Sequence, residues 1–363
     1  MELNVFSTEQ WMTDHEGSAI FNLTDTCVRP LMLSELQAMD HDHLLDHITM
    51  DYGTIAGDPR LRKEISALYE NADIDNITLA NGCNEANKLV IETLLEKGDR
   101  VITFTPGYQL FTSYPESMGC CVTALKLYEE KGWLPDETEL GKAFEQPVKL
   151  VILNQPNNPT GTVFPLALQD KLVVLCRKWN AWLLVDEVYR TPQLPSVSDS
   201  YAYGISTASL SKTMGLAGLR LGWIKGPEDL IHAINYRRDY SLISTGPLID
   251  TLGLVAMQNR EFLQKRADSI ISRARQAVSE WLETENKCSL IMPKTGTVSF
   301  LRYDADIPSA ELCEQLQEQY GVFFVPGSCF GCEHHVRLSF TKDPEYMKEG
   351  LQRFSQYLRE SGK

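Results

Sequence analysis

The sequence lacks any extended run of basic residues. Its 34 lysines and arginines are scattered along 363 residues and face 49 acidic residues, which gives a net charge of -15. A protein that binds nucleic acid or an anionic membrane surface through bulk charge needs clustered basic side chains. We therefore expect neither kind of partner, and an anionic small ligand would need local arginines or helix ends to hold it.

Long apolar runs and a secretory leader are also lacking. No stretch approaches the roughly 20 apolar residues of a membrane-spanning helix, and the opening MELNVFSTEQWMTDHEG has no basic start followed by an apolar run. The nine cysteines are an odd number without regular spacing. In a chain too long to need disulfide staples, this pattern favours reduced thiols. We therefore expect a soluble, cytoplasmic protein.

Two cofactor motifs and a convincing metal motif are missing as well. No G-x-G-x-x-G follows a predicted strand and no G-x-x-x-x-G-K-[ST] occurs. The sequence therefore gives no support for binding of a nicotinamide cofactor or a nucleoside triphosphate. His41, His43 and His47 lie close together, but the last two suit a polar helix face. The segment CFGCEHH at 329–335 contains a single C-x-x-C. We expect no metal site.

What the sequence does contain is alternation of apolar and amphipathic segments between residues 75 and 225. Strands are predicted at NITLAN, RVITFTP, KLVILNQP, AWLLVDEVY and ISTASLS, and helices at CNEANKLVIETLLEKGD and PLALQDKLVVLCRKWN. Such alternation is typical of an α/β fold with a mostly parallel sheet covered by helices on both faces. One long helix is predicted over 246–285, leading to a smaller α+β unit.

Polar and aromatic residues follow the predicted strands, where ligands bind in open parallel sheets. The strand-to-helix turn at Gly82, Cys83 and Asn84 offers backbone N–H groups to a phosphate. Tyr108 could stack on a flat heterocycle or pack beneath its loop. Asn158, in NQPNNPTG, is held in a rigid turn as a hydrogen-bond donor, although a simple Asx-turn also explains the proline and glycine.

The stretch TASLSKTMGLAGLRLGW surrounds Lys212 with small hydroxyl residues and glycine. A lysine attacks aldehydes only when it is partly deprotonated, through desolvation or nearby positive charge. Ser209 and Arg220 could hold a phosphate. Asp186, at the end of LLVDEVYR, could pair with a protonated ring nitrogen, or could be a helix cap or surface ion pair, and Tyr189 lies three residues on. This combination of groups suits pyridoxal phosphate.

In order along the chain, these motifs resemble the class I/II aminotransferases, pyridoxal-phosphate enzymes of fold type I. The resemblance rests on YGTIAGDPRLRKEI, NGCNEAN, NNPTG, the D-x-x-Y, S-x-S-K, PGSCFG and HHVRLSF, from Tyr52 to Arg337, about four-fifths of the chain. It implies a seven-stranded-type sheet in a large cofactor domain, residues 46–250. It also implies a small domain formed by 1–45 together with 251–363.

The resemblance also implies a role for each matching residue. Lys212 would form the Schiff base with the cofactor and carry the proton, with Asp186 on the pyridinium nitrogen. The other cofactor-binding residues would be Gly82, Cys83, Asn84, Tyr108, Asn158, Tyr189, Ser209 and Arg220. Tyr52 would reach the phosphate of a neighbouring subunit, which implies a homodimer. Arg337 would clamp the substrate α-carboxylate, and Asn158, Cys27 and Val28 would also contact substrate.

Three functions follow as hypotheses. The first is an aminotransferase that moves an amino group between an amino acid and a 2-oxo acid through Lys212. The second is a pyridoxal-phosphate lyase, cyclase or racemase, because NLTDTCVRP and RRDYSLISTGPL resemble the branch that contains capreomycidine synthase. The third is a ligand-sensing module, against which the full set of catalytic residues argues. Arg29 would suit an acidic substrate side chain.

Overall fold

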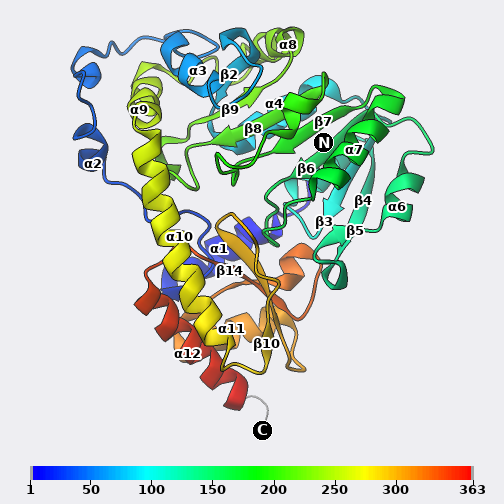
Figure 1. Cartoon of the computed structure of the whole chain (residues 1–363), viewed down its shortest axis with the longest axis vertical. Coiled ribbons are helices and arrows are strands. Elements are labelled where there is room, and N and C mark those ends of the chain that lie inside the picture. Colours follow the sequence, from blue (N-terminus) through cyan, green and yellow to red (C-terminus); the bar gives the residue numbers. More distant parts are fainter. Residues whose placement is uncertain (1–2, 361–363) are drawn as a thin grey trace.

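The computed structural model describes residues 3–360 and contains an eight-stranded and a four-stranded sheet (Figure 1). The large sheet has the order β2-β9-β8-β7-β6-β3-β4-β5. Its strands are β2 (Ile77–Ala80), β3 (Arg100–Thr105), β4 (Cys121–Tyr128), β5 (Leu134–Pro135), β6 (Leu150–Asn154), β7 (Trp182–Asp186), β8 (Gly204–Ser209) and β9 (Gly222–Lys225). All five strands predicted in this region are present, and β4, β5 and β9 complete the sheet.

Strand direction brings the ends of several strands to one edge. Strands β8, β7, β6, β3 and β4 run parallel, whereas β2 and β9 are antiparallel to each other, β9 to β8 and β5 to β4. The expectation of an α/β fold with a mostly parallel sheet is thus confirmed. At the carboxyl edge, Asp186 pairs with Asn154 on one side and with Thr207 on the other. This row of polar residues forms the floor of the site described below.

Helices cover both faces of the large sheet because its inner strands are apolar on both sides. In β7, Leu183 and Val185 pack with helix α7 (Leu166–Trp179), whereas Leu184 packs with α4 (Gly82–Leu94) and α8 (Glu228–Arg238). The remaining helices of this region are α3 (Pro59–Ser66), α5 (Leu110–Ser117) and α6 (Glu137–Ala143). Within residues 3–360, no helix combines the length and the apolar character needed to cross a membrane.

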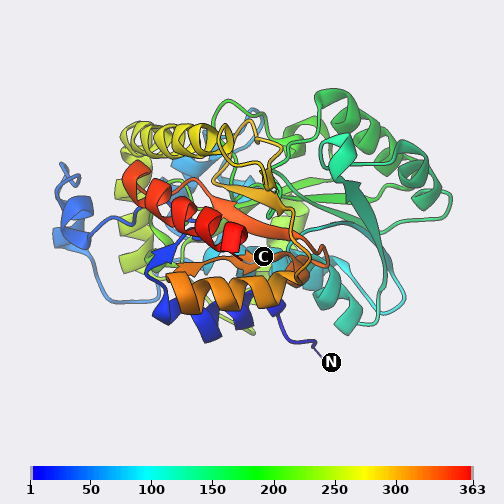
Figure 2. The same ribbon diagram turned by 90° about the horizontal axis from the view of Figure 1, so that it is seen from below.

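The four-stranded sheet is antiparallel and belongs to the C-terminal part of the chain (Figure 2). Its strands are β10 (Cys288–Ser289), β11 (Val298–Tyr303), β13 (Val325–Pro326) and β14 (His335–Ser339), and its helices are α11 (Ser309–Tyr320) and α12 (Pro344–Glu360). The N-terminal segment joins this unit, because β1 (Phe21–Asn22) pairs in parallel with β12 (Val322–Phe323). The short helices α1 (Ser7–His15) and α2 (Leu33–Gln37) flank β1.

The prediction of a single helix over 246–285 is wrong, because two helices meet there at Asn259. They are α9 (Pro247–Gln258) and α10 (Arg260–Leu282). The Asn259 side chain donates to the carbonyls of Met39 and Val255, and asparagine that bonds to backbone in this way competes with regular helix geometry. Helix α9 packs against the large sheet and most of α10 against the small one. We propose that the domain boundary lies at this junction.

Candidate active site

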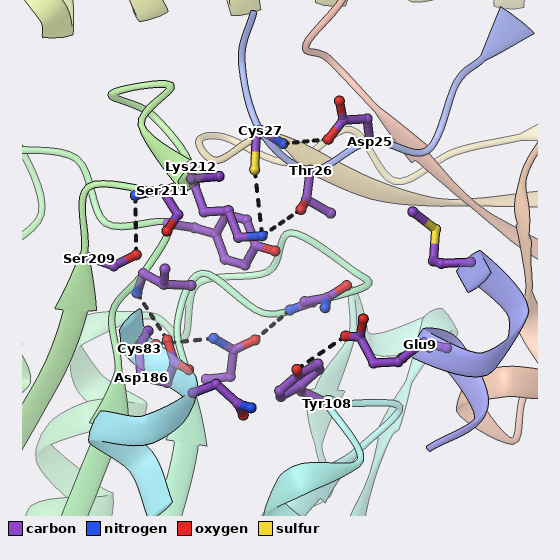
Figure 3. Close-up of a pocket in the computed structure, with 18 of the residues that line it drawn as sticks. Glu9, Asp25, Thr26, Cys27, Cys83, Tyr108, Asp186, Ser209, Ser211 and Lys212 are labelled. Atoms are coloured by element: carbon purple, nitrogen blue, oxygen red, sulfur yellow. Dashed lines mark hydrogen bonds between the residues drawn. The ribbon is translucent and has the colours of Figure 1, made fainter. Parts of the chain in front are cut away.

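A cavity of about 570 Å³ lies beside the carboxyl edge of the large sheet (Figure 3). Residues from both sheets and from α1 line it. Most of the predicted site residues are among them, namely Cys27, Cys83, Asn84, Tyr108, Asn158, Asp186, Tyr189, Ser209, Lys212, Arg220 and Arg337. The structure therefore brings together side chains that are up to 310 positions apart in the sequence (337 − 27).

One end of the cavity is an anion-binding cup at the start of α4. The Asn81 side chain does not cap this helix, so its first N–H groups remain available. Gly82 has a φ of +80°, and a Cβ there would lie 2.4 Å from Nη2 of Arg220. Arg220 has no carboxylate partner within the described part of the chain; its Nη1 donates to the Ala217 carbonyl. A glycine, a helix end and an unpaired guanidinium form a site for phosphate.

Asp186 forms the floor of the cavity and is held by neighbours in the sheet and in α4. Its Oδ1 accepts from the Val188 N–H at 3.0 Å and its Oδ2 from Asn87 Nδ2 at 2.7 Å. Thr207 in turn donates to Asn87 Oδ1 at 2.6 Å. Burial raises the pKa of Asp186, because no cation lies within ion-pair distance in residues 3–360 to balance its charge. A buried carboxylate of this kind suits a cationic ligand atom.

Lys212 follows β8 and is half-buried above this floor. Its Nζ donates to Thr26 Oγ1 at 2.7 Å, lies 3.7 Å from Cys27 Sγ, and is 5.8 Å from the centre of the Tyr189 ring. Burial alone would lower the pKa of Lys212, but the neighbouring acidic groups of Tyr189 and Cys27 outweigh it, and the pKa is raised. The neighbouring side chains therefore favour the protonated amine, although the positive charge of Arg337 acts in the opposite direction.

Arg337 lies on β14 and reaches the cavity from the side of the small sheet. Its Nε donates to Thr24 Oγ1 at 3.0 Å and its Nη1 to Asn158 Oδ1 at 3.4 Å, while Nη2 lies 4.0 Å from Met12 Sδ. It is 6% exposed, burial lowers its pKa, and it has no carboxylate partner in residues 3–360. A buried guanidinium fork with spare N–H donors is a binding site for a carboxylate.

Several cavity residues have no counterpart in the sequence analysis. They include Thr8, Glu9, Met12 and Glu16 in the first segment, together with Thr26 and Asn87. Asn87 could have been found, because a polar residue one turn after Cys83 interrupts the apolar face of a helix. Helix α1 gave no such signal. The Tyr108 hydroxyl donates to Glu9 Oε1 at 3.2 Å, and this contact joins residues about 100 positions apart, so no local pattern reveals it.

Three residues singled out in the sequence lie outside the cavity. Val28 does not contact it, because the Val28 side chain is fully buried in the core around α10 and only its N–H reaches the Lys212 carbonyl, at 3.1 Å. Arg29 forms an ion pair with Glu35 at 2.9 Å instead of facing the cavity, so it gives no support for an acidic substrate side chain. Tyr52 is 74% exposed.

The histidine and cysteine clusters are separate from the cavity. His43 makes an exposed contact with Asp46 at 3.5 Å, and Cys332 Sγ lies 3.6 Å from His335 Nδ1. Across residues 3–360, no group of three or more histidine, cysteine, aspartate or glutamate side chains is arranged to hold a metal ion.

The arrangement of the cavity fits pyridoxal phosphate at each of its functional groups. The α4 N-terminus and Arg220 would hold the phosphate, and the buried Asp186 carboxylate would pair with the ring nitrogen. Tyr108 lines the same cavity and could stack on the ring, and the Lys212 amine is within it to meet the aldehyde. Arg220, Asp186 and Lys212 thus each have a matching feature on this cofactor.

Comparison with known proteins agrees with this chemistry. The family model "Aminotransferase class I and II" matches residues 25–354. Capreomycidine synthase from Streptomyces vinaceus is 29% identical over 360 residues, 96% of this chain and 92% of that protein. Aspartate aminotransferase from Pyrococcus horikoshii is 25% identical over 86% of this chain and 84% of that protein.

A solved structure covers the whole chain. The crystal structure of a PLP-dependent aminotransferase from Streptococcus suis 89-1591 is similar with a TM-score of 0.96 and 34% identity, over 100% of both chains. The family match, the fold and the groups in the cavity agree with one another. The chain therefore belongs to the class I and II aminotransferases, the pyridoxal-phosphate-dependent enzymes of fold type I.

Proposed function

We propose that the protein is an aminotransferase that moves an amino group between an amino acid and a 2-oxo acid. One observation carries the proposal: the Lys212 amine, the buried Asp186 carboxylate and the unpaired Arg337 guanidinium face a single cavity. The similarity to a PLP-dependent aminotransferase structure and to an aspartate aminotransferase supports it. In this reaction Lys212 would act on the Cα proton, Asp186 on the ring nitrogen of the cofactor and Arg337 on the substrate carboxylate.

The residues of the chain would divide the work as follows. Bound pyridoxal phosphate supplies an aldehyde and a ring that accepts electrons. Arg337 would bind the substrate carboxylate, and its hydrogen bond to Asn158 holds the guanidinium group in place. Lys212 Nζ, once it has given up its own extra proton, would remove the proton from the substrate Cα as general base. Asp186, held by Asn87, keeps a proton on the ring nitrogen.

The half-reaction without an acceptor tests this proposal. Cofactor-loaded protein is mixed with an amino acid but no oxo acid, and the absorption spectrum of the cofactor is recorded. An aminotransferase converts the cofactor stoichiometrically to pyridoxamine phosphate, and a 2-oxo acid then reverses the change. Release of ammonia or water without accumulation of pyridoxamine phosphate would contradict the proposal.

A second candidate is a pyridoxal-phosphate lyase, cyclase or racemase. Two observations favour it: Lys212 contacts Thr26 and Cys27, which belong to the segment that departs from the common family pattern, and capreomycidine synthase is 29% identical over nearly the whole chain. Product analysis by mass spectrometry in the same half-reaction separates the candidates. A cyclised, dehydrated or epimerised amino acid supports this second function.

Arg337→Lys is expected to weaken substrate binding and leave cofactor binding intact. A lysine cannot offer two parallel N–H donors to a carboxylate, so we expect kcat/KM to fall about 10- to 100-fold, mainly through KM. Steady-state kinetics measure the effect. Arg302→Lys is the matched control, because Arg302 lies on the neighbouring strand β11 and outside the cavity. An unchanged KM in the Arg337 variant would mean that the carboxylate is held elsewhere.

We also propose that the enzyme is a homodimer in which Tyr52 contacts the phosphate bound by the neighbouring subunit. Its high exposure and its position outside its own cavity support this. Tyr52→Phe removes one hydrogen bond to a charged group, so the Kd for cofactor should rise about tenfold or more. Spectral titration and sedimentation velocity measure it, with the exposed Tyr240→Phe as control. A monomer, or an unchanged Kd, counts against the proposal.

A further inference from the structure

Helix α1 forms one wall of the cavity, and its residues suggest what the substrate side chain carries. Thr8, Glu9, Met12 and Glu16, the last of these in the turn after α1, line the cavity, a spacing that places them along one side of a helix. Figure 3 shows Glu9 pointing from this helix toward Tyr108. Met12 Sδ lies 4.0 Å from Nη2 of Arg337, so the wall begins beside the carboxylate clamp.

Two glutamates at this wall, both exposed to solvent, have no cationic partner of their own. Four acidic side chains line the cavity. Asp25 pairs with Lys342 at 2.8 Å, and Asp186 would pair with the ring nitrogen. Glu9 accepts only from the Tyr108 hydroxyl, at 3.2 Å, and Glu16 only from Asn22 Nδ2, at 2.8 Å. Neither glutamate has a cationic partner in the described part of the chain.

The three cations of the cavity cannot supply that partner, because the proposed function uses each of them. Arg337 would bind the α-carboxylate, Arg220 the phosphate, and Lys212 the aldehyde and the Cα proton. Burial and the neighbouring Asp25 raise the pKa of Glu16, against the opposing effects of Asn22, Lys342 and Arg337. A bound cation would relieve that repulsion.

An independent observation places a hydrogen-bond acceptor at the same wall. The Thr8 side chain is 3% exposed and lines the cavity, yet its Oγ1 has no hydrogen-bond partner in the described structure. Buried hydroxyl groups in folded proteins are almost always hydrogen-bonded. The Thr8 hydroxyl therefore retains hydrogen-bonding capacity for a ligand at the wall that also carries Glu9.

We propose that Glu9, with Thr8, binds a cationic group at the end of the substrate side chain, so that the enzyme acts on α-amino acids that end in an ammonium or guanidinium group. The inference rests on the proposed function, because it takes Arg337 as the α-carboxylate clamp. Glu9 precedes Met12 by about one helical turn, roughly 5 Å along the axis. A side chain of about three or four carbons spans that length from the clamp.

Three amino acids of equal length test the charge preference. Lysine is cationic, norleucine neutral and 2-aminoadipate acidic, and each is mixed with cofactor-loaded protein in a stopped-flow spectrometer. The concentration dependence of the spectral change gives an apparent Kd for each, whatever reaction follows. We expect lysine, or ornithine or arginine, to bind at least about tenfold more tightly than norleucine, and 2-aminoadipate to bind most weakly.

Glu9→Gln should remove this preference, raising the Kd of lysine about tenfold or more and leaving that of norleucine unchanged. Glutamine keeps an acceptor for the Tyr108 hydroxyl, so the wall is retained. Asp14→Asn is the matched control, since Asp14 lies on the same helix outside the cavity. Thr8→Val is the second variant and should weaken lysine binding in the same direction, with the melting temperature as a check on folding.

The outcomes separate this inference from the function on which it rests. Tighter binding of norleucine or 2-aminoadipate, or an equal effect of Glu9→Gln on all three amino acids, would overturn the inference alone. A cofactor spectrum that no amino acid perturbs would instead overturn the proposed function. Loss of the lysine preference in Asp14→Asn as well would mean that bulk charge on the helix, not the contact with Glu9, sets it.

Discussion

Lys212→Ala is expected to lower kcat by about 10³-fold or more and to prevent borohydride from attaching the cofactor covalently to the protein. A positioned general base contributes roughly 10²- to 10⁴-fold to a proton transfer, and Lys212 is the lysine among the residues that line this cavity. Single-turnover absorbance measures the rate, and mass spectrometry after reduction measures the attachment.

Lys212→Arg separates loss of the amine from loss of its charge. The guanidinium keeps the positive charge beside Tyr189 but does not release a proton at neutral pH, so this variant should be as inactive as the alanine variant. Cofactor should still bind through the cup around Gly82 and Arg220, which circular dichroism of the cofactor can follow. Substantial turnover by either variant would mean that another group moves the Cα proton.

Asp186→Asn is expected to slow removal of the Cα proton by about 10²- to 10³-fold while the cofactor stays bound. The variant keeps the shape of the side chain but loses the charge that holds a proton on the ring nitrogen, and loss of one preorganised electrostatic contact typically has this effect. The primary kinetic isotope effect with Cα-deuterated substrate should increase. Turnover equal to that of the parent would remove the argument for a charged ring nitrogen.

The stability of the cofactor-free protein provides a second measurement on Asp186→Asn. Burial raises the pKa of Asp186, so the native state holds this proton more tightly than the unfolded chain does. Stability is therefore lost as pH rises through the raised pKa. Asparagine removes that loss, and the melting temperature of the variant should exceed that of the parent at pH values above the raised pKa of Asp186. Asn87→Ala, which removes a positioning residue, should lower activity less than Asp186→Asn does.

The inner part of the large sheet could be predicted from the sequence because its strands are short apolar runs bounded by turn residues. The direction of β9 could not be predicted, because the segment GWIK carries no signal for parallel or antiparallel pairing. Its antiparallel pairing with β2 also joins segments about 145 positions apart. The break at Asn259 was also hidden. The Asn259 side chain there donates to the Met39 carbonyl, a contact that depends on tertiary structure and does not alter the helical periodicity of the sequence.

The candidate site divides in a similar way. Residues that end a predicted strand, such as Asp186 and Asn158, could be assigned because parallel strands share an edge. In the irregular segment before α2 the resemblance named both Cys27 and Val28, but only Cys27 lines the cavity, whereas Val28 is in the core. Neither backbone period applies to such a segment. Glu9 was missed because its role depends on how α1 lies against Tyr108.

The close contact between Gly82 and Gly222 bears on how this enzyme could be redesigned. A Cβ on Gly222 would lie 2.5 Å from the Gly82 carbonyl carbon and 2.7 Å from the Cys83 nitrogen, so neither β9 nor the start of α4 can accept a larger residue there. A mutant library should keep both glycines fixed and vary Thr8 and Glu9. Holoenzyme formation and donor choice could then be evolved independently.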